Sequence, residues 1–218
     1  MSLRTSAAAA LALCLLWAVI AFGVRTVIQL RRSGDSGFRG LSGARGSVEW
    51  WAGVLFIAAI VLGLIAPVAQ LADLVEPVSL LDHSLVRWAG AVVALAGIAA
   101  TFAAQVSMGD SWRVGVDEAE RTELVTAGAF HLARNPIFTA MALTAAGLAL
   151  LAPNLLALGG FAALVVALQL QVRRVEEPYL VATHGRNYLA YASQVGRFIP
   201  GLGRLSTAGT AAPVRETA

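Results

Sequence analysis

Four long stretches of the sequence contain no charged residue, and they constrain the fold more than any other feature. Three of them are residues 5–24, 50–72 and 88–105. Each is close to the roughly 20 residues that a helix needs to cross about 30 Å of hydrocarbon at 1.5 Å per residue. We interpret the first stretch as a retained membrane helix rather than a cleaved signal, because no clear cleavage site follows it.

The fourth stretch, residues 136–171, is too long for a single span and carries Pro153 and Asn154 near its middle. We therefore expect a helical hairpin, which brings the number of transmembrane helices to five in an all-α integral membrane protein. Small residues on both arms should let the arms pack tightly on each other. These residues are Ala145, Ala146, Gly147, Gly159, Gly160, Ala162 and Ala163.

The composition agrees with a membrane protein and excludes other classes. Only 13% of the residues are charged and 58% are hydrophobic, whereas a soluble globular domain has about 25% charged residues. The net charge of +3 is too small and too dispersed to indicate binding to nucleic acid. The single cysteine, Cys14, and the three histidines show no metal-ligand spacing, so we expect no metal site.

Arginine placement predicts which helix ends face the same side of the membrane. All but two of the 16 basic residues, Arg4 and Arg87, lie in the first connection, the third connection or the segment after the hairpin. Because positive residues gather on the cytoplasmic side, we expect the N-terminus outside and the C-terminus in the cytoplasm. The arginine-only, alanine-rich and glycine-rich composition is typical of a GC-rich bacterial genome, which favours a bacterial inner membrane.

The chain divides into three parts. Residues 1–105 hold the first three transmembrane helices, and residues 106–200 hold the hairpin with most of the polar motifs. Residues 201–218 form a tail rich in Thr, Ala and Pro that we expect to be disordered. Residues 33–47, rich in Gly and Ser, are expected to form a flexible cytoplasmic loop.

Two polar segments flank the hairpin on its predicted cytoplasmic side. The first, residues 108–135, ends in Arg134 and Asn135 directly before Pro136. Proline is well tolerated at the first position of a helix, so we expect Asn135 to cap the helix, whose free amides and Arg134 would suit a carboxylate. The second segment, residues 169–200, carries Arg173, Arg174, Glu176, Glu177, Tyr188 and Tyr191.

The order of motifs in residues 109–200 resembles the isoprenylcysteine carboxyl methyltransferase family and its phospholipid-methylating relatives. Arg-Asn-Pro-x-Phe opens the hairpin, and Arg-x-x-Glu-Glu, Gly-x-x-Tyr-x-x-Tyr and Arg-Phe-Ile-Pro follow it. The resemblance implies a membrane enzyme that binds S-adenosylmethionine from the cytosol in a pocket capped by C-terminal helices, and that methylates a lipophilic acceptor. Asn135 and Phe138 stand where the family usually has His and Tyr.

The chemistry of S-adenosylmethionine suggests a role for each candidate residue. Glu176 and Glu177 suit the ammonium group or the ribose, and Arg134 suits the carboxylate. Three aromatic residues, Phe138, Tyr188 and Tyr191, suit the sulfonium. Val125, Gly128 and Phe130 would flank the adenine. The resemblance supports cofactor binding at Arg134, Asn135, Pro136, Glu176, Glu177, Tyr188 and Tyr191.

The acceptor, a lipophilic small molecule or a lipid, determines which groups catalysis needs. If the acceptor is a carboxylate, it needs only positioning, and Arg173 or Arg174 would orient it. If it is a thiol, hydroxyl or amine, Glu176, Glu177 or His131 would act as the base. We thus place Arg173, Glu176 and Glu177 as candidate catalytic residues.

Structural interpretations compete with these roles. Arg173 and Arg174 lie three or four residues from Glu176 and Glu177, so local ion pairs within one helix would explain all four. Arg134 would anchor the hairpin to lipid headgroups, and Tyr188 and Tyr191 would anchor an amphipathic helix to the membrane surface. Two other functions also fit the chain: a membrane reductase of the sterol-reductase type, and a non-catalytic membrane scaffold or lipid-binding protein.

Overall fold

The computed structural model describes residues 1–34, 43–108 and 124–205, and these residues form helices joined by short connections without a strand. The expected disorder of the tail and most of the expected flexible loop lie outside the described residues. The helices are α1 (Leu3–Ala18), α2 (Arg25–Ser33), α3 (Val48–Leu71), α4 (Ser84–Met108), α5 (Pro136–Leu151), α6 (Leu155–Leu170) and α7 (Glu177–Gln194). Short 3-10 turns, η2 (Ser79–Leu81) and η4 (Gly128–His131), precede α4 and α5.

Four helical segments are long and apolar enough to cross a membrane. They are Leu3–Arg31, Val48–Leu71, Ser84–Met108 and Leu155–Gln194. Helix α5 is also apolar, but its 16 residues make it shorter than these four. The prediction of an all-α fold is therefore confirmed for the described residues, with four helices long and apolar enough to span a membrane, while the count of five spans stays a prediction.

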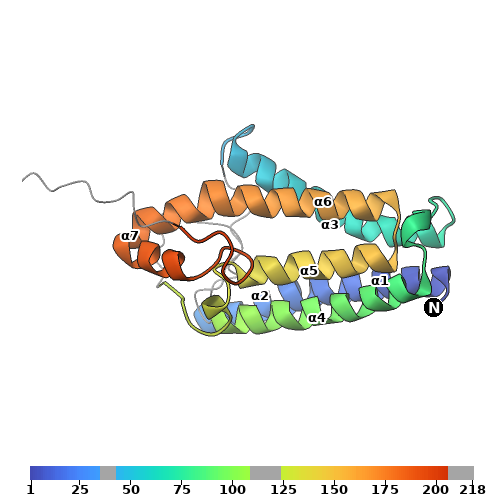
Figure 1. The fold of residues 1–218 in the computed structure, drawn as a ribbon, viewed down its shortest axis with the longest axis horizontal. Coiled ribbons are helices and arrows are strands. Elements are labelled where there is room, and N and C mark those ends of the chain that lie inside the picture. The colour runs from blue at the N-terminus through green and yellow to red at the C-terminus, as the bar shows by residue number, and fades with distance from the viewer. Residues whose placement is uncertain (35–42, 109–123, 206–218) are drawn as a thin grey trace, which may run out of the picture.

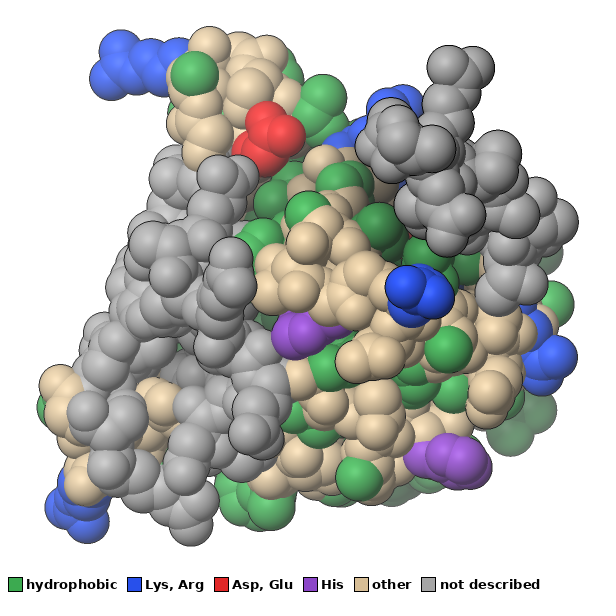
Figure 2. Space-filling model, turned by 90° about the vertical axis from the view of Figure 1, so that its left-hand side faces the viewer, with side chains coloured by type: hydrophobic (Ala, Val, Ile, Leu, Met, Phe, Trp, Pro, Cys, Tyr) green, Lys and Arg blue, Asp and Glu red, His purple; other side chains and the backbone are tan. Residues whose placement is uncertain are grey.

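The helices run side by side along one axis, so that the connections gather at two ends (Figure 1). At one end lie the N-terminus, the connection between α3 and α4, and the turn between α5 and α6. At the other end α4 finishes, α5 begins and α7 folds over; we call this end the polar end. Figure 2 views the polar end directly and shows arginine and histidine side chains scattered among hydrophobic ones. Both polar segments thus reach the same end of the bundle.

The two arms of the hairpin pack mainly on other helices rather than on each other. Helix α5 makes its most extensive contacts with α4, and α6 makes its own with α3. A Cβ atom on Gly147 would lie 2.3 Å from the Ala94 backbone nitrogen and 2.7 Å from the Gly90 carbonyl oxygen, so α4 and α5 touch backbone to backbone. A Cβ atom on Gly160 would lie 3.0 Å from the Leu62 side chain of α3.

The expectation that small residues let the two arms pack on each other is therefore wrong for Gly147 and Gly160, which meet α4 and α3. Small residues permit close approach of two helices in lipid, but they do not specify the partner. In this fold they produce two tight pairs, α4 with α5 and α3 with α6, while α1 contacts both pairs.

The turn of the hairpin is fixed by Asn154, whose side chain is fully buried. Its Oδ1 accepts a hydrogen bond of 3.0 Å from the Ala157 backbone N–H and so caps α6. Its Nδ2 donates to the Ala66 carbonyl oxygen at 3.1 Å and to Gln70 Oε1 at 3.0 Å. These bonds join the turn to the end of α3.

Two π-helical turns continue the long helices at the polar end. Helix α1 passes through Val19–Val24 into α2, and α6 passes through Gln171–Glu176 into α7. Helix α7 then breaks at Gly185, whose φ of 51° and ψ of −124° are not helical. Because a glycine has no Cβ, it adopts this conformation at little cost, and the second half of α7 can turn back towards the bundle.

Candidate functional site

Glu177, the first residue of α7, is the centre of a buried charged cluster at the polar end. Its carboxylate accepts two hydrogen bonds from Arg197, from Nε at 2.7 Å and from Nη2 at 2.9 Å. Its Oε1 also lies 2.9 Å from Arg134 Nη1. Glu177 is only 8% exposed, so these ion pairs lie largely out of solvent. These ion pairs join Arg134, which precedes the hairpin, to Glu177 and Arg197, which follow it.

Arg134 makes the widest set of contacts in this cluster and is only 5% exposed. Its Nη1 donates to Tyr188 Oη at 2.9 Å, and its Nη2 donates to the Gly203 carbonyl oxygen at 2.8 Å. Its guanidinium carbon lies 5.8 Å from the centre of the Tyr188 ring. We call Arg134, Glu177, Tyr188 and Arg197 the Glu177 cluster.

The segment after α7 is fixed to the start of α5 by backbone hydrogen bonds. The backbone N–H of Arg134 donates to the Gly196 carbonyl oxygen at 2.8 Å, and that of Asn135 donates to the Arg197 carbonyl oxygen at 3.0 Å. A Cβ atom on Gly196 would lie 2.1 Å from the Ile199 carbonyl oxygen, so only glycine fits this close turn. Arg134 and Asn135 therefore form one folded unit with the segment after α7.

Asn135 does occupy the N-cap position of α5, with Pro136 as the first helical residue. Its side chain does not cap the helix, however, because Nδ2 donates to the Arg197 carbonyl oxygen at 3.0 Å instead. The prediction of Asn135 as the N-cap residue is therefore confirmed, although its side chain bonds to the segment after α7 rather than to the α5 backbone. The side chain helps to hold Arg197 in place for its contact with Glu177.

The Glu177 cluster combines the two positive charges of Arg134 and Arg197 with the one negative charge of Glu177. Glu176 is half-buried beside the cluster and supplies a second negative charge. The hydrogen bonds that Arg197 donates to Glu177 raise the pKa of the Arg197 guanidinium above its usual value. Arg134 Nε is buried and has no hydrogen-bond partner among the described residues. A guanidinium with a spare buried donor suits an anionic group such as a carboxylate.

Tyr191 connects the same cluster to the short turn before the hairpin. Its hydroxyl donates to the Phe130 carbonyl oxygen at 2.6 Å, and its ring lies 6.3 Å from that of Tyr188 in an edge-on arrangement. Gly128 begins this turn with a φ of +61°, and a Cβ atom on it would lie 2.9 Å from Ser107 Oγ of α4. The structure thus brings Phe130, Tyr191 and Tyr188 together, as expected for one site.

Other predicted residues lie elsewhere. Val125 is half-buried in the stretch that leads to this turn. Phe138 points into the bundle, where it packs on the hydrophobic clusters around Met141 and around Leu164. The structure therefore does not place Phe138 with Tyr188 and Tyr191, because α5 turns its ring towards the apolar interior.

Glu177 does not form the expected ion pair with Arg173 or Arg174. Arg173 and Arg174 are exposed, and Arg173 Nε donates to Gln169 Oε1 at 2.9 Å. Glu176 Oε1 accepts a bond of 3.4 Å from Gln171 Nε2. Glu177 instead pairs with Arg134 and Arg197, so the prediction of a local quartet is wrong for this residue.

The anchoring interpretations are also wrong for two residues. Arg134 is buried among protein groups rather than facing headgroups, and Tyr188 is only 1% exposed. Arg197 was the residue that sequence reasoning missed. Arg197 is the first residue of the Arg-Phe-Ile-Pro motif. The sequence clue to its role is that a buried glutamate must be paired with a positive charge, and that this charge can come from a distant part of the chain.

Fold and site together define a helical membrane protein with a buried charged cluster at one end. The family model described as phospholipid methyltransferase matches residues 85–187. This is the family of the isoprenylcysteine carboxyl methyltransferase-like membrane enzymes, so the resemblance is confirmed over this segment. The match includes α4, the hairpin, Arg134 and Glu177, and ends one residue before Tyr188. No curated protein matches the chain.

Proposed function

We propose that the protein is an S-adenosylmethionine-dependent methyltransferase that acts on a lipophilic acceptor at the polar end of the bundle. The family match supports a membrane methyltransferase. The observation that carries the proposal is the Glu177 cluster, in which two segments far apart in the sequence meet beside an apolar bundle.

The residues at the polar end fit the chemical groups of S-adenosylmethionine. The Arg134 guanidinium, whose buried Nε has no partner among the described residues, suits the carboxylate of its amino-acid head. Glu176 is half-buried next to the cluster and suits the ammonium group or the ribose hydroxyls. The remaining candidates for the sulfonium and the adenine are Val125, Gly128, Phe130, Tyr188 and Tyr191.

When bound, S-adenosylmethionine supplies an electrophilic methyl group. The protein's contribution to such a transfer is chiefly to hold the reacting groups about 3–3.5 Å apart and aligned. A fixed frame is suited to this task, and the backbone bonds of Arg134 and Asn135 to the segment after α7 supply one. Arg173 and Arg174, which are exposed at the same end, remain candidates for orienting an acidic acceptor.

The position of the cluster also suits two reactants of opposite solubility. A water-soluble cofactor reaches the polar end from the aqueous phase, whereas a lipophilic acceptor reaches it from the bilayer. We place this end on the cytoplasmic side of a bacterial inner membrane, with the N-terminus outside. The arginine-rich connections support this orientation, because positive residues favour the cytoplasmic side.

Isothermal titration calorimetry of the purified protein in detergent tests the proposal. We expect S-adenosylmethionine to release or absorb heat with a saturable profile, and Arg134→Gln to weaken binding at least tenfold because a charge-assisted bond is lost. Glu76→Gln, an exposed acid at the opposite end, is the control and should bind as the wild type does. Saturable binding of NADPH with none of S-adenosylmethionine would contradict the proposal and favour a reductase.

A further inference from the structure

The segment after α7, residues 195–205, forms a closely bonded loop at the polar end, which we call the C-terminal loop. Its tip is a turn in which the Leu202 backbone N–H donates to the Ile199 carbonyl oxygen at 3.0 Å. Pro200 and Gly201 are the second and third residues of this turn, and Gly201 has a φ of +79°. Proline and glycine at these two positions are typical of a type II β-turn, so the sequence itself fixes the tip.

The C-terminal loop lies beside the first turn of α5. Thr139 Oγ1 donates to the Phe198 carbonyl oxygen at 2.7 Å, and Thr139 lies three positions after Pro136, the first residue of α5. At 1.5 Å per residue this contact lies about 4.5 Å into an apolar helix. In Figure 1 the chain after α7 turns back towards the start of α5. The loop therefore lies where the apolar part of the bundle begins, which in a membrane is the border between headgroups and acyl chains.

Two large hydrophobic side chains of the loop are exposed. Ile199 is 55% exposed and Leu202 is 63% exposed. In α7, by contrast, no large hydrophobic side chain is exposed. Because Ile199 and Leu202 lie at the level of the membrane border, contact with acyl chains would remove their apolar surface from water and so stabilise this arrangement.

Arg204 supplies a positive charge beside these two side chains. The residue is exposed, and a Cβ atom on Gly201 would lie 3.7 Å from Arg204 Nη2, so the guanidinium lies next to the tip of the loop. Among the described residues no acid forms an ion pair with Arg204. An arginine next to apolar side chains at the membrane border suits the phosphate of an anionic lipid headgroup.

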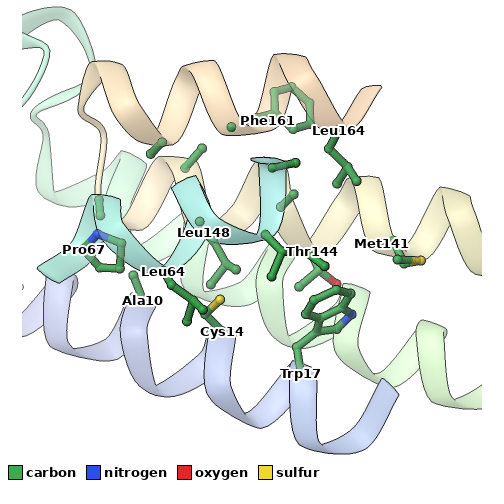
Figure 3. Close-up of a pocket in the computed structure, with 18 of the residues that line it drawn as sticks. Ala10, Cys14, Trp17, Leu64, Pro67, Met141, Thr144, Leu148, Phe161 and Leu164 are labelled. Carbon is green, nitrogen blue, oxygen red and sulfur yellow. The ribbon is translucent and has the colours of Figure 1, made fainter. Parts of the chain in front are cut away.

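The interior of the bundle offers no alternative place for such a headgroup. It contains a cavity of about 70 Å³, and Figure 3 shows Cys14, Leu64, Leu148 and Phe161 around it. No charged residue lines this cavity. A phosphate in the cavity would lose its hydration without gaining an ion pair, which is costly. A headgroup must therefore bind at the outer surface of the bundle.

We propose that the C-terminal loop binds an anionic phospholipid of the leaflet at the polar end. Ile199 and Leu202 lie among its acyl chains, and Arg204 binds its phosphate, which no ammonium group of the same headgroup neutralises. The loop also contacts the Glu177 cluster, since Arg134 Nη2 donates to the Gly203 carbonyl oxygen at 2.8 Å. The inference goes beyond the proposed function and does not rest on it, because the lipid is a bound partner and not a reactant.

Fluorescence quenching in vesicles tests the position of the loop. In a Cys14→Ala background, Leu202→Cys is labelled with the apolar fluorophore bimane, and the protein is reconstituted in phosphatidylcholine. A small share of this lipid carries a nitroxide on its acyl chain. We expect quenching to be roughly twofold or more stronger at Leu202→Cys than at Asn187→Cys, an exposed position of α7. Equal quenching at the two positions would overturn the contact with acyl chains.

The same label at Leu202→Cys tests the choice of headgroup. The nitroxide is placed on phosphatidylglycerol or on phosphatidylcholine, at the same mole fraction. Because one arginine near the membrane surface favours an anionic lipid about fivefold, we expect phosphatidylglycerol to quench more strongly. Arg204→Gln should remove this difference. Arg186→Gln, which removes another exposed arginine at the polar end, is the matched control and should keep the difference.

Three results would overturn the proposed lipid site. Equal quenching by the two lipids would show that the loop does not select an anionic headgroup. Loss of the difference in Arg186→Gln as well as in Arg204→Gln would assign the preference to the overall charge of the polar end. Loss of the difference when inorganic phosphate replaces chloride at equal ionic strength would indicate a site for free anions. A melting curve verifies that each variant is folded, and no measurement uses S-adenosylmethionine, so failure here leaves the proposed function untouched.

Discussion

Glu177→Gln removes the negative charge that pairs with both Arg134 and Arg197 at the polar end. The substitution keeps the shape of the side chain, but a neutral amide cannot compensate two buried guanidinium groups. In the wild type three contacts of 2.7 to 2.9 Å join the carboxylate to Arg134 and Arg197. The side chains of these partners are 1% and 14% exposed, so solvent screens the pairs only weakly.

The expected cost follows from this burial. Removing one partner of a buried ion pair costs about 3–5 kcal/mol, because the remaining charge is left uncompensated. Each kcal/mol lowers the melting temperature of a chain of this size by about 2–4 °C. We therefore expect Glu177→Gln to melt roughly 6–20 °C below the wild type.

Tryptophan fluorescence during heating of the purified protein in detergent measures this shift. Glu76→Gln makes the same chemical change at an exposed position and should leave the melting temperature within about 2 °C. If Glu177→Gln melts together with this control, the carboxylate does not stabilise the polar end, and the reasoning from burial and charge is wrong.

Three further predictions concern the fold. Gly147→Leu should destabilise the bundle by about 1–3 kcal/mol or more in thermal melting, because the new Cβ meets α4 backbone, whereas Gly159→Leu should be neutral; equal melting would contradict the backbone contact. Asn154→Ala should cost about 1–3 kcal/mol in the same assay, and no loss would show that the hairpin turn is held otherwise. In a cysteine-free background, a membrane-impermeant maleimide added to intact cells should label Glu76→Cys and not Ile199→Cys; the reverse pattern would invert the topology.

The membrane-spanning elements were predictable from the sequence because their physical cause is local. Uncharged runs of about 20 residues give helices, and the expected spans at 50–72 and 88–105 correspond to α3 (Val48–Leu71) and α4 (Ser84–Met108). Proline at the start of α5 and Asn154 at its turn marked the hairpin correctly. The packing partners of its arms were not predictable, since small residues occur on several faces of each helix.

The ion-pair partners of Glu177 could not be predicted from the spacing of residues in the sequence, because they depend on the backbone geometry around it. Glu177 lies four positions after Arg173, a spacing that places the two residues on one face of a regular α-helix. The turn Gln171–Glu176 is instead π-helical and winds more widely, so this rule fails there. The actual partner, Arg197, lies 20 residues away and returns to Glu177 through the break at Gly185.

Several candidate residues lie together in the structure, although their contacts were not predicted. Arg134, Glu177 and Tyr188 were expected in one site, and the structure joins them through buried hydrogen bonds and ion pairs. Their roles towards a cofactor remain predictions. The sequence did not predict which way Phe138 points, because an aromatic residue near the end of an apolar helix can face either the interior of the bundle or its polar end.

Transfer of a radiolabelled methyl group tests the central claim most directly. Membranes that contain the protein are incubated with S-adenosylmethionine labelled in the methyl group, and the organic-soluble fraction is counted. We predict that label accumulates in this fraction with the wild type and with Glu76→Gln, and falls to the level of membranes without the protein for Arg134→Gln. No accumulation with the wild type above those control membranes, when they also contain its lipids, would contradict a methyltransferase that acts on a lipophilic acceptor.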